Sequence, residues 1–147
     1  MKAKEYLQQI YRLSISIDQK IEEADSIMEM ALSVKSPGLS YDKVGGGGPS
    51  DKVALYVTKY LELYEEVQNQ KLSLTLLKHK IIDEINRLDD RLYIQILHKR
   101  YVCMEPFTKI AYELGYNYRW CLELHGRALE AFDNEILKEL TQTDIDV

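Results

Sequence analysis

The chain has few of the residues that interrupt helices and no long apolar run. It holds only three prolines and seven glycines among its 147 residues, and four of the glycines are consecutive at 45–48. Because proline and glycine end helices, this distribution predicts long uninterrupted helices joined by one flexible loop. No apolar stretch approaches the roughly 18 residues of a membrane span, and the N-terminal MKAKEYLQQIYR does not resemble a signal peptide. We therefore expect a soluble cytoplasmic protein without membrane contact.

Cysteine is scarce as well, since Cys103 and Cys121 are too few for a secreted disulfide framework. With His98 and His125 they could supply zinc ligands, but neither CxxC nor HxxxC spacing is present. We interpret Cys121 as a buried structural thiol and expect no metal and no cofactor. The segment VGGGGPSD lacks the lysine of a P-loop, and no nucleophile–base pair or ligand cluster is evident. An enzymatic activity is therefore not expected.

The net charge of −5 is unusual for a nucleic-acid-binding protein, but the charges are unevenly distributed. Residues 1–90 carry 12 basic and 15 acidic side chains, and residues 133–147 carry 1 and 5. Residues 91–132 carry 6 basic and 4 acidic side chains, so this segment alone is slightly basic. A nucleic-acid contact, if there is one, is expected there.

The first 88 residues contain two apolar seams with heptad spacing, which is typical of helices that pack along their length. The first seam is Ala3, Leu7, Ile10, Ser14, Ile17, Ile21, Ala24, Met28 and Ala31. The second is Val53, Tyr56, Tyr60, Leu63, Val67, Gln70, Leu74, Leu77, Ile81 and Leu88, with Glu84 at the skipped step. Between them the Gly-rich loop 36–50 cannot continue a helix, and Ser50 or Asp51 is a suitable N-cap for the second helix.

Folding the chain back at this loop places residues whose numbers add up to roughly 86 opposite one another. Ser14 then lies near Gln70, so that one polar layer helps to fix the register. The opposite phasing would bury Lys71 and Lys78 and is rejected. Residues 1–88 are therefore predicted to form a long antiparallel, coiled-coil-like helical hairpin.

Residues 89–132 read as three shorter helices. Asp89 or Asp90 can cap a helix that runs to about Tyr101 or Val102, and Pro106 suits the start of the next, 107–114. Gly115 then ends that helix, Asn117 caps the last one, and the inner stripe of the last helix is Cys121, Leu124, Ala128, Leu129 and Phe132. A short helix, a Gly-containing turn and an amphipathic helix are typical of a helix-turn-helix. The chain is thus predicted to be all-α, with an acidic tail at 133–147.

Four short motifs give this segment a likeness to known proteins: Arg100-Tyr101, Ile110-Ala111, Leu114-Gly115 and Arg127-Ala128-Leu129. Their order and spacing resemble region 4, the C-terminal DNA-binding region of sigma-70-type factors. The opening AKEYLQQIYRL, the GGGG loop and the ending RWCLELHGRAL resemble phage and prophage proteins of low-GC Gram-positive bacteria. That group is related to the late-gene transcriptional regulators of the RinA and ArpU type. The resemblance implies a helical hairpin followed by a sigma-like helix-turn-helix.

The resemblance also implies which residues meet DNA. Positions facing bases or phosphates fall on Tyr118, Arg119, Leu122 and Glu123, with Trp120 beside them. Arg119 can bind a guanine edge bidentately, Glu123 can accept from a cytosine amino group, and Leu122 can touch a thymine methyl. The candidates for phosphate contacts, which position a protein without specifying a sequence, are Lys99, Arg100, Lys109 and Arg127.

Structural interpretations of the same residues stay open beside these. Trp120 could pack against the hairpin, and Arg127 could pair with Glu130 or with a carboxylate of the preceding helix. His125 is expected to be partly buried rather than to read a base. Three further rings could form a stacking surface, or belong to the core or an amphipathic boundary: Tyr112, Tyr116 and Tyr118.

The sequence as a whole favours a phage-type transcriptional regulator that binds double-stranded DNA, host RNA polymerase, or both. Its hairpin would supply a homodimer contact or an arm for another partner. Two alternatives remain. One is a DNA-packaging protein similar to a small terminase subunit, and the other is a sigma-mimicking interaction or inhibitor protein that does not bind DNA.

Overall fold

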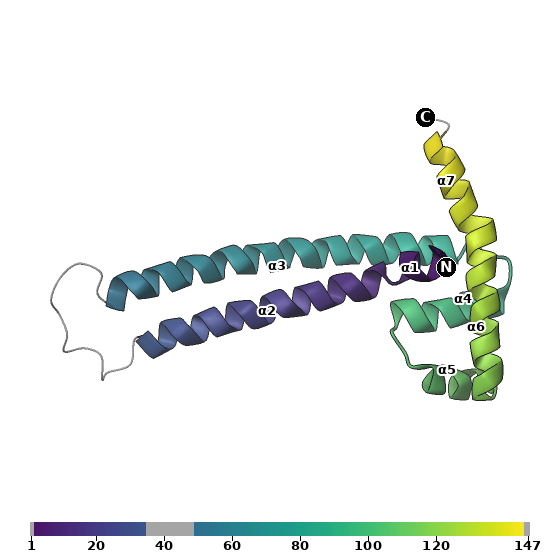
Figure 1. Cartoon of the computed structure of the whole chain (residues 1–147), viewed down its shortest axis with the longest axis horizontal. Helices are drawn as coiled ribbons and strands as arrows, with labels where there is room; N and C mark the ends of the chain where they lie inside the picture. The colour runs from purple at the N-terminus through teal and green to yellow at the C-terminus, as the bar shows by residue number, and fades with distance from the viewer. Residues whose placement is uncertain (1, 35–48, 146–147) are drawn as a thin grey trace. The chain divides into compact units, whose positions relative to one another are not determined.

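Helices account for all of the regular secondary structure in residues 2–34 and 49–145, which are the residues that the computed structural model describes (Figure 1). The chain divides into two compact units, Leu13–Ser73 and the combination of Met1–Arg12 with Leu74–Val147. Among the helices described, none is both long enough and apolar enough to cross a membrane. Because the regular secondary structure of the described residues is entirely helical, the all-α prediction is confirmed for this part of the chain.

The two longest helices, α2 (Gln9–Val34) and α3 (Pro49–Ile85), form the predicted antiparallel pair (Figure 1). In the unit 13–73, the members of both predicted seams are buried or half-buried, whereas Lys71 is exposed. Lys20 Nζ lies 2.8 Å from Glu66 Oε2, and the predicted register places these two residues opposite one another. The antiparallel pair is confirmed, and this ion pair agrees with the predicted register.

The polar layer of this pair is described only in part. Ser14 and Gln70 are both half-buried, as the seams predict. Gln70 Oε1 is buried and has no hydrogen-bond partner within the described part of the chain, so the Ser14 hydroxyl does not donate to it. The proximity of these two side chains stays a prediction.

Two boundaries differ from the prediction. Helix α3 already begins at Pro49, so Ser50 and Asp51 lie in its first turn rather than before it. Proline is favoured in a first turn because its missing N–H has no helical partner there. The rest of the predicted loop, 36–48, lies outside the described residues. The first helix is also irregular at Gln8, where α1 (Lys2–Leu7) gives way to α2.

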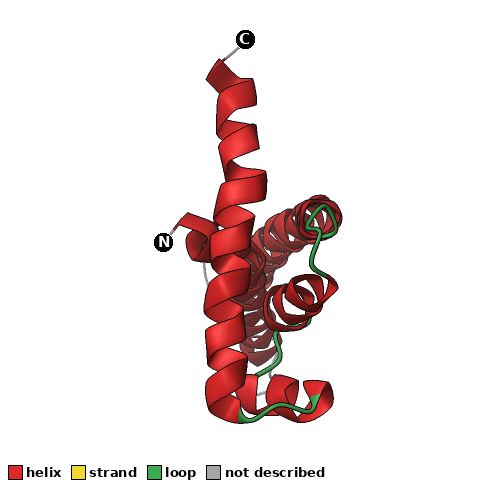
Figure 2. Ribbon diagram, turned by 90° about the vertical axis from the view of Figure 1, so that its right-hand side faces the viewer, coloured by secondary structure: helices red, strands yellow, loops and turns green. Residues whose placement is uncertain are grey.

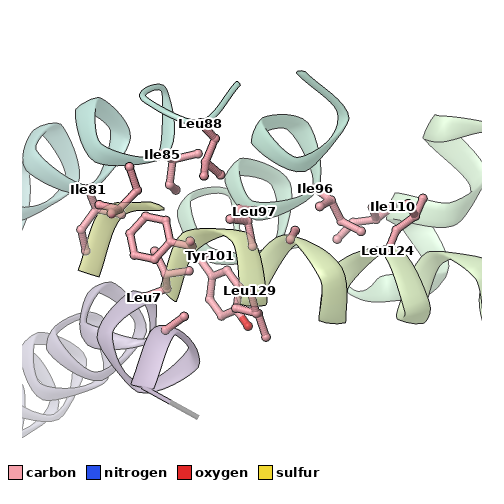
Figure 3. Close-up of a cluster of buried hydrophobic side chains, with 14 of the residues drawn as sticks. Leu7, Ile81, Ile85, Leu88, Ile96, Leu97, Tyr101, Ile110, Leu124 and Leu129 are labelled. Carbon is pink, nitrogen blue, oxygen red and sulfur yellow. The ribbon is translucent and has the colours of Figure 1, made fainter. Parts of the chain in front are cut away.

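The unit formed by 2–12 and 74–145 has its own hydrophobic core. The end of α3 and α1 contribute to it, together with α4 (Arg91–Leu97), α5 (Phe107–Leu114) and α6 (Tyr118–Phe132) (Figure 3). Its largest fully buried side chains are Leu7, Ile10, Ile81, Ile85, Ile96, Leu97, Ile110, Cys121 and Phe132. The apolar positions predicted for separate helices therefore meet in one cluster.

Local capping explains where the shorter helices begin and end. Asp90 is the N-cap of α4, because its Oδ1 accepts from Leu92 N at 2.8 Å and from Tyr93 N at 3.3 Å. A π-helical turn, His98–Val102 (η2), continues α4 to the predicted end. At the other end of the unit, α6 continues through a second π-helical turn, Asp133–Leu137 (η3), into α7 (Lys138–Ile145) (Figure 2). Most of the predicted acidic tail is thus helical.

Candidate nucleic-acid interface

Helices α5 and α6 are joined by Gly115, Tyr116 and Asn117, and we call this two-helix element the α5–α6 corner (Figure 2). Gly115 has φ 75° and ψ 27°, the left-handed conformation. Tyr116 N donates to Ala111 O at 3.0 Å and Gly115 N donates to Tyr112 O at 3.2 Å, which is the Schellman pattern. Asn117 Oδ1 accepts from Trp120 N at 2.8 Å and caps α6. The predicted Gly and Asn roles are confirmed.

The two glycines of the corner give opposite predictions on substitution. Gly115→Ala should lower the free energy of unfolding by about 1 kcal/mol, because an L side chain is strained at this positive φ. Gly126 lies inside α6, and a Cβ atom there would meet nothing within 4 Å. Gly126→Ala should therefore raise the free energy of unfolding by about 0.5–1 kcal/mol. Urea unfolding of both variants measures this, and equal signs would show that the turn is not held as described.

The inner faces of the two helices hold the corner together. In α5, Ile110 and Ala111 are buried and Phe107 and Leu114 are half-buried. All members of the predicted α6 stripe are buried: Cys121, Leu124, Ala128, Leu129 and Phe132. Because α6 buries this single stripe, its opposite face is left to solvent along its first turns.

That outer face carries most of the residues predicted to meet bases. Tyr118 is 51% exposed and Leu122 is 39% exposed, and Arg119 and Glu123 are exposed as well. The Arg119 side chain makes no hydrogen bond and no ion pair with any other described residue. A cation in the first turn of a helix is disfavoured by the helix dipole. The fold itself therefore gives Arg119 no stabilising role.

Trp120 and Arg127 are engaged with other parts of the unit. Trp120 is half-buried and packs against the core of this unit, whereas its packing against the hairpin stays a prediction. The Arg127 guanidinium lies 5.1 Å from the centre of the Trp120 ring, and its Nη2 is 3.0 Å from Glu123 Oε1. The two pairings suggested for Arg127, with Glu130 or with the preceding helix, are thus wrong. Glu123 lies four residues earlier in α6, and this spacing brings the two side chains together on the helix surface.

The predicted phosphate-binding lysines share two carboxylates. Lys99 Nζ donates a hydrogen bond to Glu113 Oε2. Lys109 Nζ lies 3.8 Å from Glu105 Oε1 and 3.9 Å from Glu113 Oε1. The hydrogen bond with Glu113 raises the pKa of Lys99, and the same bond lowers the pKa of the Glu113 carboxyl. We call Lys99, Lys109, Glu105 and Glu113 the lysine–glutamate cluster. Its acidic members were not identified from the sequence, although the four-residue spacings to Lys109 gave a signal for both.

Arg100, the remaining candidate for a phosphate contact, lies in η2 and packs against the start of α5. Its guanidinium is 4.1 Å from the centre of the Phe107 ring, and its Nη1 donates to Glu105 O at 3.1 Å. The side chain is half-buried. Arg100 therefore ties the segment before α5 to η2 and is poorly placed to follow a phosphate backbone.

His125 lies inside the same unit, as predicted. Its Nε2 is 2.7 Å from the Tyr101 hydroxyl, and its ring stacks on Tyr101 and meets Phe107 edge-on at 4.7 Å between centroids. Burial lowers the pKa of His125 to about 4, and the charges of Arg100 and Lys4 act in the same direction. Burial also raises the pKa of Tyr101 to about 12. The neutral imidazole of His125 is thus part of the packing of α6 against η2 and α5.

Three tyrosines are exposed on or near the corner. Tyr112 is 87% exposed, Tyr118 is 51% exposed and Tyr116 is 40% exposed. The core interpretation of these rings is therefore wrong, and a stacking surface or an amphipathic boundary remains. Tyrosine is enriched in binding surfaces because it offers an apolar ring together with a hydroxyl group.

The two cysteines differ in burial. Cys121 is fully buried, as predicted, and Cys103 is exposed. Residues 2–34 and 49–145 contain no cluster of three or more side chains suited to hold a metal ion. Comparison of the chain with protein-family models, with curated proteins and with solved structures finds no match.

Proposed function

We propose that the α5–α6 corner is a helix-turn-helix similar to sigma region 4, and that it binds double-stranded DNA to regulate transcription. One observation carries the proposal: the first turns of α6 present Tyr118, Arg119 and Leu122 to solvent, opposite a fully buried stripe. Arg119 has no partner among the described side chains and lies at the end of the helix that recognition helices direct at bases. Its planar guanidinium matches the O6 and N7 acceptors of guanine.

The other cations of the corner could bind DNA phosphates only by giving up the carboxylates with which they are now paired. Arg127 is paired with Glu123 at the surface, and Lys99 and Lys109 are paired within the lysine–glutamate cluster. Exposed ion pairs of this kind contribute only about 0.2–1 kcal/mol, so DNA phosphates can replace the carboxylates at low salt. The carboxylates nevertheless oppose binding, and the affinity of the wild type for random DNA should be modest.

The test is fluorescence anisotropy with duplexes tiled across the DNA that neighbours the gene, at two salt concentrations. We expect one tile to bind preferentially, and Arg119→Ala to weaken binding to that tile about tenfold or more. Arg119→Lys keeps the charge but loses the bidentate geometry, so it should lose tile preference while keeping salt-dependent binding. If Arg119→Ala left the affinity for every tile unchanged, α6 would not be the reading helix.

Glu113→Gln provides a variant that should gain function. It removes the carboxylate bound by Lys99, so Lys99 becomes available to phosphates, while Lys109 keeps Glu105 as a partner. Binding should tighten several-fold, and the slope of log K against log salt should steepen by about 1. Glu65→Gln, on the exposed surface of α3 in the other unit, makes the same change in net charge without touching the lysine–glutamate cluster and should alter neither quantity.

A second candidate function is docking onto a protein, with host RNA polymerase as the first partner to test. Two observations favour it: the exposed rings of Tyr112, Tyr116 and Tyr118, and the internal neutralisation of Lys99, Lys109 and Arg127. No DNA binding at low salt, combined with saturable binding to purified RNA polymerase that Tyr112→Ala weakens, would favour this function over the first.

A further inference from the structure

Helix α3 carries a second stripe beside the seam that faces α2, apolar except for one glutamine. Within the unit 13–73 its members recur at steps of three and four residues, none is charged, and Glu65 and Lys71 flank them. Exposure of the larger side chains is high, at 58% for Leu61, 51% for Tyr64 and 61% for Leu72. We call this set the α3 side stripe: Ala54, Val57, Leu61, Tyr64, Gln68 and Leu72.

The spacing of the stripe indicates which kind of surface would cover it. A heptad stripe is matched by another helix with the same repeat, since its side chains must enter holes between four residues of the partner. From Ala54 to Leu72 the stripe extends over roughly 27 Å at 1.5 Å per residue. Each copy of this chain contains such a helix of the required length and repeat.

The stripe is continuous with packing that the unit already contains. Residues of the stripe follow residues of the α2–α3 seam directly in sequence, as in Tyr60-Leu61 and Leu63-Tyr64. A groove of about 160 Å³ lies between α2 and α3 and is lined by Ile21, Ala24, Asp25, Tyr60, Tyr64, Val67, Gln68 and Lys71. Because Tyr64 and Gln68 belong to both features, a helix laid on the stripe would also cover this groove.

We propose that the α3 side stripe pairs with the same stripe of a second copy, antiparallel about a two-fold axis, to form a four-helix bundle. In this pairing the small Ala54 lies opposite the large Leu72 of the second copy, and Leu61 lies opposite Tyr64. In this register Glu65 lies opposite Tyr60 and Leu61 of the second copy rather than opposite another carboxylate. Parallel pairing would instead set Ala54 against Ala54 and leave a gap, so the size alternation selects the antiparallel arrangement.

The dimer should be weak. A single stripe covers a footprint of roughly 27 Å by 10 Å, which is smaller than the approximately 800 Å² per partner of a standard interface. Association is therefore expected at micromolar concentrations. It does not depend on DNA binding by the corner, so the two proposals can fail separately.

Sedimentation velocity of the full chain from about 1 to 300 µM tests the association. We expect conversion from monomer to dimer, and at least tenfold weaker dimerisation for Leu61→Glu and, separately, for Leu72→Glu. Leu55→Glu is the matched control, because Leu55 is 71% exposed on a different face of α3 and its change should leave the dimer intact. Far-UV circular dichroism verifies that each variant keeps its helices. A monomer at all concentrations, or a dimer that neither stripe variant weakens, would overturn the proposal.

Cysteine cross-linking tests the orientation in a Cys103→Ser background, because Cys103 is an exposed thiol. Mixing the Ala54→Cys and Leu72→Cys chains under oxidation should give mainly the disulfide between the two different chains. Self-cross-linking of Ala54→Cys alone, exceeding the mixed product, would overturn the antiparallel pairing. DNA binding lost in Arg119→Ala with dimerisation unchanged would separate the two surfaces.

Discussion

Tyr6→Phe is expected to lower the free energy of unfolding by about 2 kcal/mol, although it removes a single oxygen atom. The Tyr6 hydroxyl lies 2.7 Å from Glu84 Oε1 and 2.6 Å from Glu84 Oε2. Glu84 is only 3% exposed, so water cannot replace the lost donor. Hydrogen bonds to charged groups contribute about 1.5–3 kcal/mol, and a buried acceptor left unpaired adds its desolvation cost. The measurement is urea unfolding, with Tyr11→Phe as the control because the Tyr11 ring is 54% exposed.

A double-mutant cycle separates the pair from its parts. Glu84→Leu should be destabilising in the Tyr6 background, since the half-buried hydroxyl then lacks its acceptor. In the Tyr6→Phe background the same change should be nearly neutral or stabilising, because it removes a buried carboxylate that has lost its donor. The expected coupling energy is about 1–3 kcal/mol. Additive effects of the two substitutions would show that Tyr6 and Glu84 do not stabilise one another.

Burial also raises the pKa of Tyr6, and the hydrogen bond to Glu84 and the charge of that carboxylate raise it further. The phenol therefore remains a donor throughout the physiological pH range. The pair joins α1 to the end of α3, residues that are 78 positions apart in sequence. It also lies beside the end of α6, since the Tyr6 and Phe132 ring centroids are 5.9 Å apart. Loss of this pair should thus loosen the attachment of α1 within the unit that contains the corner.

The fold of this chain was largely predictable because its helices depend on local spacing. The two heptad seams identify the faces of α2 and α3 that meet, and the exclusion of Lys71 and Lys78 from those seams selects the phase. Gly115 and Asn117 specify the corner through backbone conformation and capping, which involve only a few neighbouring residues. Such signals can be read without knowledge of distant parts of the chain.

The partners of the charged side chains were much less predictable. The Arg127 side chain could reach several carboxylates. Its pairing with Glu123 depends on the rotamers of both side chains, which their spacing in the sequence does not determine. Lys99 meets Glu113 across 14 residues, and Tyr6 meets Glu84 across 78. Contacts of this kind depend on how packed helices are aligned. The sequence therefore located the candidate surface, but it did not reveal that carboxylates already neutralise most of the predicted phosphate contacts.

The irregularity of the first helix at Gln8 likewise involves side-chain contacts that could not be predicted from the apolar spacing. The seam from Ala3 to Ala31 predicts one helix, and the backbone bonds from Gln8 N to Lys4 O and from Arg12 N to Gln8 O keep its direction. At this point side chains donate to two backbone carbonyls of the helix: Gln9 Nε2 donates to Tyr6 O, and Arg12 Nη2 donates to Glu5 O. Side-chain donors compete with the helical ladder in a way that apolar spacing does not reveal.

Acidification should destabilise the unit that carries the corner, through His125. Its pKa is lowered to about 4 in the folded protein, first by burial and then by the charges of Arg100 and Lys4, whereas an unperturbed histidine titrates near 6.5. Between these two values the unfolded chain binds a proton that the folded chain does not bind. The stability that depends on neutral His125 is therefore fully present above about pH 6.5 and is lost as the pH falls toward 4.

The expected loss over this window is about 2 kcal/mol, less than the full linkage value because the half-buried ring is partly screened by solvent. His125→Gln removes the titration and should flatten the dependence of unfolding free energy on pH between 4 and 6.5. His79→Gln is the control, since His79 is exposed on α3. Because the His125 ring of α6 stacks on Tyr101 and contacts Phe107, protonation should also disturb α6, which is the helix proposed to contact DNA. Anisotropy at pH 5 and pH 7 should then show weaker tile preference at pH 5 in the wild type. If the pH profile of His125→Gln matched that of the wild type, other groups would control the acid sensitivity.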